Sequence, residues 1–284
     1  MNNKEKIQKL ELISAQVRRD IVRMVNIAKS GHPGGSLGCA DMMTALYFYA
    51  MNIDINKPTQ ETKGQDLFFL SNGHITPVLY SVMGRRGYFP ISELATFRQL
   101  GTRLQGHPSP VSGLPGIRVA SGSLGQGLSV AMGAAHAKKY NQDNSLVYVM
   151  TGDGELQEGQ NWEAIMFAGA HKIDNLIAIV DYNKVQIDGR LDDVISLGDL
   201  EKKWIVFGWE VLRGNGNKME EVVNMLDEAK SLTGKGKPIV ILMDTEMGMG
   251  VDFMMGTSKW HGVAPNDEQT KIALQQLPET LGDF

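Results

Sequence analysis

Short apolar runs alternate along the chain with longer segments in which apolar residues recur at helical spacing. The runs are continuous, which is typical of strands that are buried on both faces of a sheet. They lie at 67–70, 146–150, 176–180, 209–212 and 239–243. Segments with helical spacing lie at 4–29, 40–50, 76–85, 126–140, 157–171 and 219–231. This order predicts βαβ units, and therefore an α/β fold with a mostly parallel central sheet flanked by helices.

The chain of 284 residues is long enough to bury a sizeable core. No internal repeat, low-complexity tract or linker divides it, so we expect one domain over residues 1–284. In sheets of this kind, ligands bind beyond the carboxyl ends of the strands. The loops that follow the apolar runs are therefore where we expect the chemistry.

Charge and cysteine content narrow the possible functions. The formal net charge is -4, with both signs mixed along the sequence, which does not favour nucleic acid or an anionic membrane as a partner. No segment reaches the roughly 18 apolar residues that a membrane span needs, and the N-terminus lacks the apolar stretch of a signal peptide. The single cysteine, Cys39, favours an inert buried thiol in a reducing compartment. We therefore expect a soluble cytoplasmic protein.

The apolar run at 146–150 leads into Gly152, Asp153 and Gly154 and then into a helical segment. A helix N-terminus after a glycine turn suits a phosphate, but Asp153 would repel it unless a divalent cation lay between them. Thirty residues later, Asn183 follows the next run. Asp153, Asn183 and a backbone carbonyl near Val185 would complete an oxygen shell for Mg²⁺, with diphosphate oxygens and water. Taken alone, these residues are also common in ordinary turns, and both interpretations stay open here.

The segments GDGELQEGQNWEA and DYNKVQIDG carry a resemblance to a known family. A GDG motif followed after about thirty residues by an Asn at a strand end resembles the thiamine diphosphate signature, and the wider segments resemble transketolase. Further motifs stand in the family's order: SGHPGGSLG, FLSNGH, GHPSP, SGSLGQGLSVAMG and KWHGVAP. The family usually has an acidic residue or Asn where Tyr182 stands, a difference that leaves the expected metal ligands in place.

Four of the six histidines stand in glycine-flanked motifs: His32, His74, His107 and His261. An imidazole beside glycine backbone can approach a ligand closely and exchange a proton near neutral pH, although each also fits an ordinary turn. The resemblance implies that all four line a channel for the sugar, with His32, His107 and His261 catalytic. It also implies that His74 and His261 lie near the diphosphate.

The glycine-rich segment at 121–127 has the spacing GxxGxG, which differs from the dinucleotide fingerprint GxGxxG. Small residues there permit close helix packing, and the resemblance implies that the backbone of Gly122, Ser123 and Leu124 cradles the cofactor. Gly154 and Ile187 are expected to contact the cofactor as well. Glu158 suits a solvated first-turn acid. The resemblance instead implies that Glu158 supports the cofactor site within a carboxylate network at an interface between subunits.

The resemblance implies an α/β thiamine diphosphate-binding fold that uses thiamine diphosphate with Mg²⁺, or Ca²⁺ or Mn²⁺ in its place. The implied reaction moves a two-carbon ketol unit from a ketose, expected to be a sugar phosphate, to an aldose. The family's cofactor-activating glutamate and pyrimidine-clasping aromatics belong to a second domain, which nothing in this sequence matches. We therefore expect the N-terminal subunit of a split transketolase, with a C-terminal subunit that carries the pyrimidine-binding domain, in an α2β2 assembly.

Two alternatives remain open at this point. Another thiamine diphosphate enzyme with separate subunits, of the keto-acid dehydrogenase or deoxyxylulose phosphate synthase type, would share the GDG motif. A non-catalytic binding subunit would share the fold but would have little reason to keep Asp153, Asn183 and the four histidines together. The histidine loops and SGHPG favour transketolase.

Overall fold

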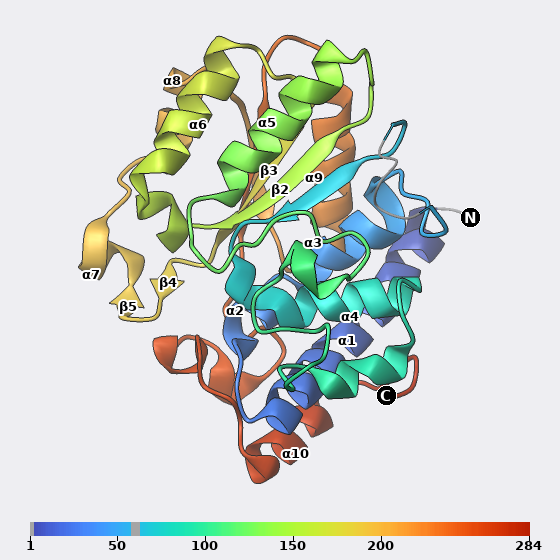
Figure 1. Cartoon of the computed structure of the whole chain (residues 1–284). Helices are drawn as coiled ribbons and strands as arrows, with labels where there is room; N and C mark the ends of the chain where they lie inside the picture. The colour runs from blue at the N-terminus through green and yellow to red at the C-terminus, as the bar shows by residue number, and fades with distance from the viewer. Residues whose placement is uncertain (1–2, 58–62) are drawn as a thin grey trace.

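The computed structural model describes residues 3–57 and 63–284, and these residues form three layers around a central sheet (Figure 1). The sheet has five strands in the order β1-β2-β3-β7-β6, and every neighbouring pair is parallel. The strands are β1 (Leu67–Leu70), β2 (Val147–Gly152), β3 (Leu176–Tyr182), β7 (Ile239–Asp244) and β6 (Glu210–Asn215). A short antiparallel hairpin, β4 (Val185–Gln186) with β5 (Gly189–Arg190), follows β3. The predicted α/β fold with a mostly parallel sheet is confirmed.

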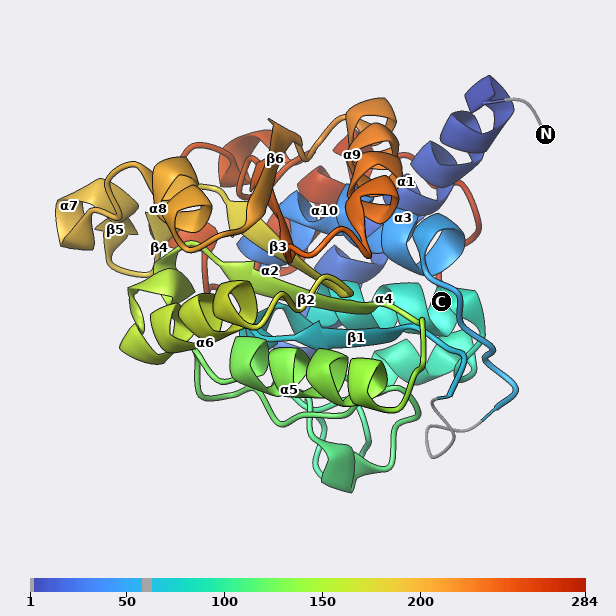
Figure 2. The same ribbon diagram turned by 90° about the horizontal axis from the view of Figure 1, so that it is seen from above.

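Helices cover both faces of the sheet, as the view from above shows (Figure 2). One face packs on α1 (Asn3–Ala28), α3 (Ala40–Ala45), α4 (Thr76–Arg86) and α9 (Met219–Leu232). The other face packs on α5 (Gly127–Tyr140), α6 (Gly159–Ala170) and α8 (Leu200–Val206). Three further helices are α2 (Pro33–Gly38), α7 (Leu191–Ile195) and α10 (Asp267–Gln276), of which α10 packs against α1. Within the described part of the chain, no helix is long and apolar enough to cross a membrane.

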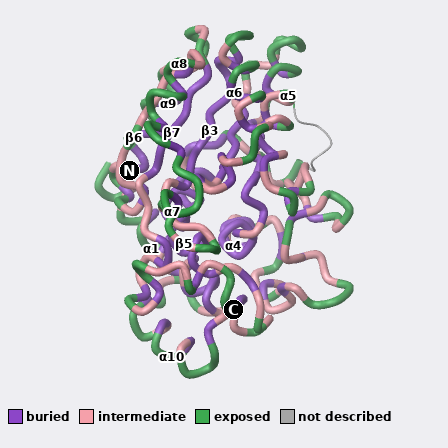
Figure 3. Tube along the Cα trace, turned by 90° about the vertical axis from the view of Figure 1, so that its left-hand side faces the viewer, coloured by how far each residue is buried: buried purple, intermediate pink, exposed green. Residues whose placement is uncertain are grey.

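The core explains why the strands are continuous apolar runs. Successive side chains of a strand point to opposite faces, so in β2 Val147 and Val149 contact the α5–α6 side while Tyr148 and Met150 contact the α1–α4 side. All four side chains are buried, and the strands lie in the interior of the molecule (Figure 3). Burying one such side chain contributes about 1.5–3 kcal/mol. Because both faces are covered by helices, neither face of a central strand can carry polar residues.

The strand prediction is wrong in one respect, at β6. The run at 209–212 was expected to be buried on both faces, yet the residues of β6 are partly or largely exposed, because β6 is an edge strand that pairs only with β7. Trp209 lies before the strand and packs edge-on against Trp204, with ring centroids 4.6 Å apart.

The helix predictions differ from the structure mainly at their ends. The helix expected at 40–50 continues from α3 as a π-helix over Leu46–Ala50. The helix expected at 157–171 begins two residues later, at Gly159, after a 3₁₀ turn over Gly154–Gln157. The helices α2, α7, α8 and α10 were not predicted. A capping box formed by Asn266 and Gln269 at the start of α10 was a usable sequence signal.

Two glycine positions test the packing of the second helical layer. A Cβ on Gly169 in α6 would lie 1.8 Å from the backbone oxygen of Phe207, whereas a Cβ on Gly133 in α5 would meet nothing within 4 Å. We expect Gly169→Ala to destabilise the fold by about 2 kcal/mol or more, because α6 must move away from the end of α8. The matched change Gly133→Ala should stabilise it by about 0.5–1 kcal/mol through helix propensity. Urea unfolding measures both, and changes of the same sign would contradict the packing described here.

Candidate active site

A cavity of about 380 Å³ lies beyond the carboxyl ends of β1, β2 and β3. The loops after these strands, the start of α2, the loop before α5 and the segment after β7 form its walls. The predicted site residues that line it are His32, His74, His107, Gly122, Leu124, Asp153, Gly154, Glu158, Asn183, Ile187 and His261. The cavity therefore lies at the edge of the sheet where the sequence predicted the chemistry.

Two of the predicted residues lie outside the cavity lining. Ser123 is exposed in the glycine loop, and Val185 is partly buried in β4. Both were expected to act through their backbone, which side-chain lining does not test. Seven lining residues were not predicted: Gly35, Asn72, Gly152, Glu155, Gln157, Asp181 and Gln186. Asn72 and Asp181 stand at or just after strand ends, so the rule that pointed to Asn183 could have found them.

Three of the four histidines form a triangle of imidazole rings. The ring centroid of His74 lies 5.0 Å from that of His32 and 5.2 Å from that of His261, and the third side is 5.6 Å. His107 lies apart from the triangle and faces Gly122, whose Cβ would be 3.5 Å from the His107 ring. Burial and the neighbouring imidazole of His261 lower the pKa of His74 to about 3 and that of His32 to about 4. Burial also lowers the pKa of His107 and His261, so the histidines are neutral at pH 7.

The loops after β2 and β3 are joined through Asp153. Its side chain is 2% exposed and accepts hydrogen bonds from the backbone N–H of Gly154 at 2.7 Å and of Lys184 at 2.6 Å. Lys184 has a φ of 63°, a left-handed conformation that is uncommon outside glycine and turns its N–H toward the carboxylate. Asn183 accepts a hydrogen bond from the N–H of Val185 at 2.9 Å, so it does cap a turn, as the alternative interpretation held. The second lone pair of that carboxamide oxygen is available for a metal.

Asp181 is a second buried carboxylate beside this turn. It accepts hydrogen bonds from the Asn183 amide at 2.8 Å, from the Thr245 hydroxyl at 2.5 Å and from the Cys39 thiol. Cys39 is fully buried, and burial raises the pKa of its thiol, as expected for an inert cysteine. Because the amide of Asn183 points to Asp181, its carboxamide oxygen is held in one orientation.

The cavity carries an excess of negative charge. Four acids line it, Asp153, Glu155, Glu158 and Asp181, and the described lining includes no lysine or arginine. None of the ion pairs between described residues involves Asp153 or Asp181. Burial, and then repulsion from Asp181, raises the pKa of Asp153 to about 7 in the protein without a cation. Buried charges are stabilised when they are paired or coordinate a metal, so these residues fit a divalent cation.

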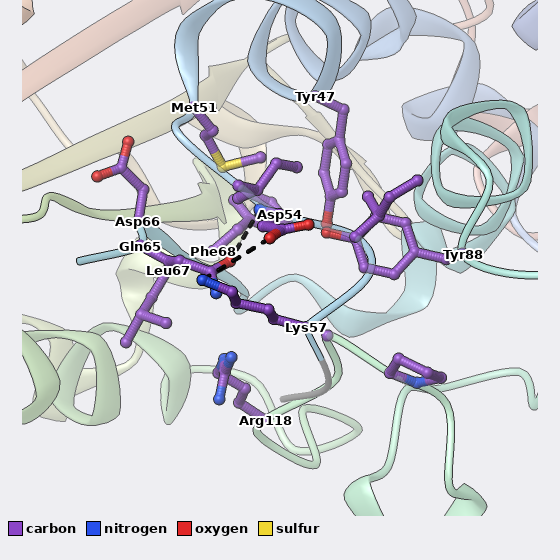
Figure 4. A pocket seen from close by; sticks show the side chains of 14 residues that line it. Tyr47, Met51, Asp54, Lys57, Gln65, Asp66, Leu67, Phe68, Tyr88 and Arg118 are labelled. Atoms are coloured by element: carbon purple, nitrogen blue, oxygen red, sulfur yellow. Dashed lines mark hydrogen bonds and ion pairs between the residues drawn. The ribbon is translucent and has the colours of Figure 1, made fainter. Parts of the chain in front are cut away.

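A second cavity lies at the opposite end of β1 (Figure 4). Tyr47, Asp66, Tyr88 and Arg118 are among the residues that line it. Its volume of about 40 Å³ is a tenth of that of the first cavity. A buried water needs roughly 10–15 Å³ by this measure, so the second cavity suits a few waters and not a cofactor.

Comparisons with known proteins place the chain in a family. The family model described as "Transketolase, thiamine diphosphate binding domain" matches residues 10–280. One of the two subunits of the apulose-4-phosphate transketolase of Phocaeicola vulgatus is 39% identical over 97% of this chain and 96% of its own length. The 6-deoxy-6-sulfo-D-fructose transketolase subunit SqwG of Clostridium sp. (strain MSTE9) is 39% identical over 93% of this chain and 96% of its own.

Solved structures give the same result. Transketolase from Campylobacter jejuni matches with a TM-score of 0.87 and 33% identity over 98% of this chain, and transketolase from Leishmania mexicana with a TM-score of 0.87 and 30% identity over 96%. The chain spans 43% and 42% of the length of those two proteins.

The fold and the family model define a thiamine diphosphate-binding domain. The chain belongs to the transketolase family. The prediction that it is the N-terminal, cofactor-binding part of a thiamine diphosphate-dependent transketolase is confirmed. The roles of the individual site residues stay predictions.

The neutral histidines predict how stability depends on pH. The pKa of His74 is about 3 in the fold against 6.5 for the free group, so its contribution to stability is complete above pH 6.5 and is lost as the pH falls below that value. We expect His74→Gln to remove part of this loss, so that the wild type loses about 1 kcal/mol more than the variant between pH 7.5 and pH 5. Urea unfolding at the two pH values measures it, with His136→Gln on the exposed face of α5 as a control. Equal losses in wild type and His74→Gln would show that His74 is not held neutral.

Proposed function

We propose that this chain is the N-terminal subunit of a split transketolase and that a separate C-terminal subunit completes its active site. The support is a difference in coverage: the relatives named as transketolase subunits match over 96% of their length, whereas the transketolase of Homo sapiens matches over 43%. We further propose one domain over residues 1–284, an α2β2 assembly with the pyrimidine-binding domain on the partner, and a cytoplasmic location. One continuous sheet and a single buried cysteine support the first and last of these.

The observation that carries the cofactor proposal is the negative charge of the cavity. A diphosphate placed beside four carboxylates would be repelled unless a divalent cation lay between them. Asp153, the carboxamide oxygen of Asn183 and the backbone carbonyl of Val185 supply three oxygen ligands for Mg²⁺, or for Ca²⁺ or Mn²⁺. The backbone of Gly122, Ser123, Leu124 and Gly154, with the side chains of His74, Glu158, Ile187 and His261, holds the rest of the cofactor.

Thiamine diphosphate, when bound, supplies the electron sink for the carbanion that forms beside the sugar carbonyl. The chain's own contribution is to bind, orient and exchange protons. His32, His107 and His261 are neutral, and a neutral imidazole can donate a proton from one ring nitrogen and accept one at the other. They are therefore suited to orient sugar hydroxyls and to transfer protons at them.

We propose a ketose, and specifically a sugar phosphate, as donor and an aldose as acceptor. Two relatives are named for apulose-4-phosphate and for 6-deoxy-6-sulfo-D-fructose, which supports a ketose carrying an anionic group. A non-catalytic binding subunit is the competing function, and turnover in the assembled protein distinguishes the two.

The split arrangement predicts that turnover requires a second chain. We expect the purified chain to give no ketol transfer with thiamine diphosphate, Mg²⁺ and a panel of ketose phosphates and aldoses, because it lacks a match to the cofactor-activating glutamate. Adding the C-terminal subunit, identified by co-purification, should restore transfer. Full activity of this chain alone would contradict the split arrangement, and no turnover in the assembled protein would favour a binding subunit.

The metal proposal predicts that cofactor binding depends on a divalent cation. In the assembled protein, we expect Asp153→Ala and Asn183→Ala each to weaken thiamine diphosphate binding in Mg²⁺ by at least about tenfold, since even groups behind metal ligands contribute that much. Asp227→Ala, an acid on α9 that bonds to Tyr49, is the control and should bind as wild type does. Calorimetry measures all four proteins. Equal affinity of the wild type in EDTA and in Mg²⁺ would exclude the bridging cation.

A further inference from the structure

Glu155 is a buried carboxylate that none of the proposed cofactor contacts uses. It follows the GDG turn, is 2% exposed and lines the floor of the cavity. A carboxylate is costly to bury unless it is fully hydrogen-bonded, so the groups that it binds indicate what it does.

The Glu155 side chain joins three segments that are distant in the sequence. Its Oε1 accepts hydrogen bonds from the hydroxyl of Ser71 at 2.5 Å and from the backbone N–H of Gly125 at 2.8 Å. Its Oε2 accepts one from the backbone N–H of Gly152 at 3.0 Å. Ser71 follows β1, Gly152 ends β2, and Gly125 belongs to the glycine loop before α5. Hydrogen bonds to an ionised acceptor are about twice as strong as those between neutral groups.

The glycine loop is held at a second point through Ser71. The hydroxyl oxygen of Ser71 accepts a hydrogen bond from the backbone N–H of Gly127 at 3.0 Å. A Cβ on Gly127 would lie 2.5 Å from the Cβ of Ser71, and a Cβ on Gly125, whose φ is 83°, would lie 2.8 Å from the Cβ of Glu158. The backbone of the loop thus lies directly against its neighbours, and Glu155 with Ser71 accepts two of its N–H groups.

We propose that Glu155 is a positioning residue that holds the loop at 121–127 in the conformation that binds the cofactor. This inference rests on the proposed contacts of Gly122, Ser123 and Leu124 with thiamine diphosphate. All three partners of Glu155 are donors, so the position requires a group that only accepts. A glutamine would turn its own N–H₂ toward one of these donors, and the loop would lose a contact without any change of volume.

The test is the dependence of turnover on thiamine diphosphate in the assembled enzyme with saturating Mg²⁺. If Glu155→Gln leaves the loop in its binding conformation only a tenth of the time, the apparent affinity falls about tenfold. We therefore expect KM for thiamine diphosphate to rise at least about tenfold, with kcat at saturating cofactor within about threefold of wild type. Ser71→Ala should raise KM by at least about threefold, and the double variant should show less than the product of the two effects because both act through one network.

Asp66→Asn is the matched control. Asp66 is also a buried carboxylate, 8% exposed, and accepts hydrogen bonds from the backbone N–H groups of Asn52 and Leu146, each at 2.8 Å. It lies before β1 at the other end of the sheet, on the second cavity (Figure 4). The same change of carboxylate to amide there should lower Tm but leave KM for thiamine diphosphate unchanged.

The outcomes separate this inference from the function on which it rests. An unchanged KM in Glu155→Gln, or an equal rise in Asp66→Asn, would overturn the positioning role. If Glu155→Gln does not fold, an unchanged KM in Ser71→Ala overturns it instead. A wild-type enzyme whose turnover does not depend on thiamine diphosphate would overturn the proposed function itself.

Discussion

The carboxyl edge of the parallel sheet leaves backbone N–H groups that no neighbouring strand can pair, and buried carboxylates accept them. Asp153 accepts from Gly154 and Lys184, and Glu155 accepts from Gly125 and Gly152. Asp181 performs the same task with side-chain donors. An ionised carboxylate suits several converging donors because it only accepts. These hydrogen bonds fix the loops after β1, β2 and β3 relative to one another, and they also concentrate negative charge at one place.

This arrangement relates the stability of the fold to its chemistry. The loops stay in place because the acids are buried, yet the same burial raises the pKa of Asp153 and Asp181, since their ionised forms are poorly solvated. A cation at the edge of the sheet would stabilise both groups. The site is therefore arranged for an anionic ligand only when a metal accompanies it, which suits a cofactor with a diphosphate.

The sequence predicted much of the fold because a parallel sheet covered on both faces makes its strands apolar throughout, as at β1. The exposure of the edge strand β6 did not follow, because burial depends on the number of neighbouring strands and not on composition alone. In the site, Asp153 and Asn183 each follow an apolar run, so their meeting at one edge could be inferred. The partnership of Glu155 with Ser71 could not, because 84 residues separate them and only the pairing of β1 with β2 brings them together.

The histidines complete this arrangement by adding hydrogen-bonding groups without adding charge. Had His32, His74 and His261 been cationic, they would have neutralised the carboxylates, and a diphosphate could have bound without a metal. Their rings lie within 5.6 Å of one another, so each protonation would disfavour the next, and burial already favours the neutral form. The negative floor and the neutral imidazoles therefore act together: the first requires that cation and diphosphate bind as a unit. The second leaves donor and acceptor nitrogens free for the hydroxyl groups of a sugar.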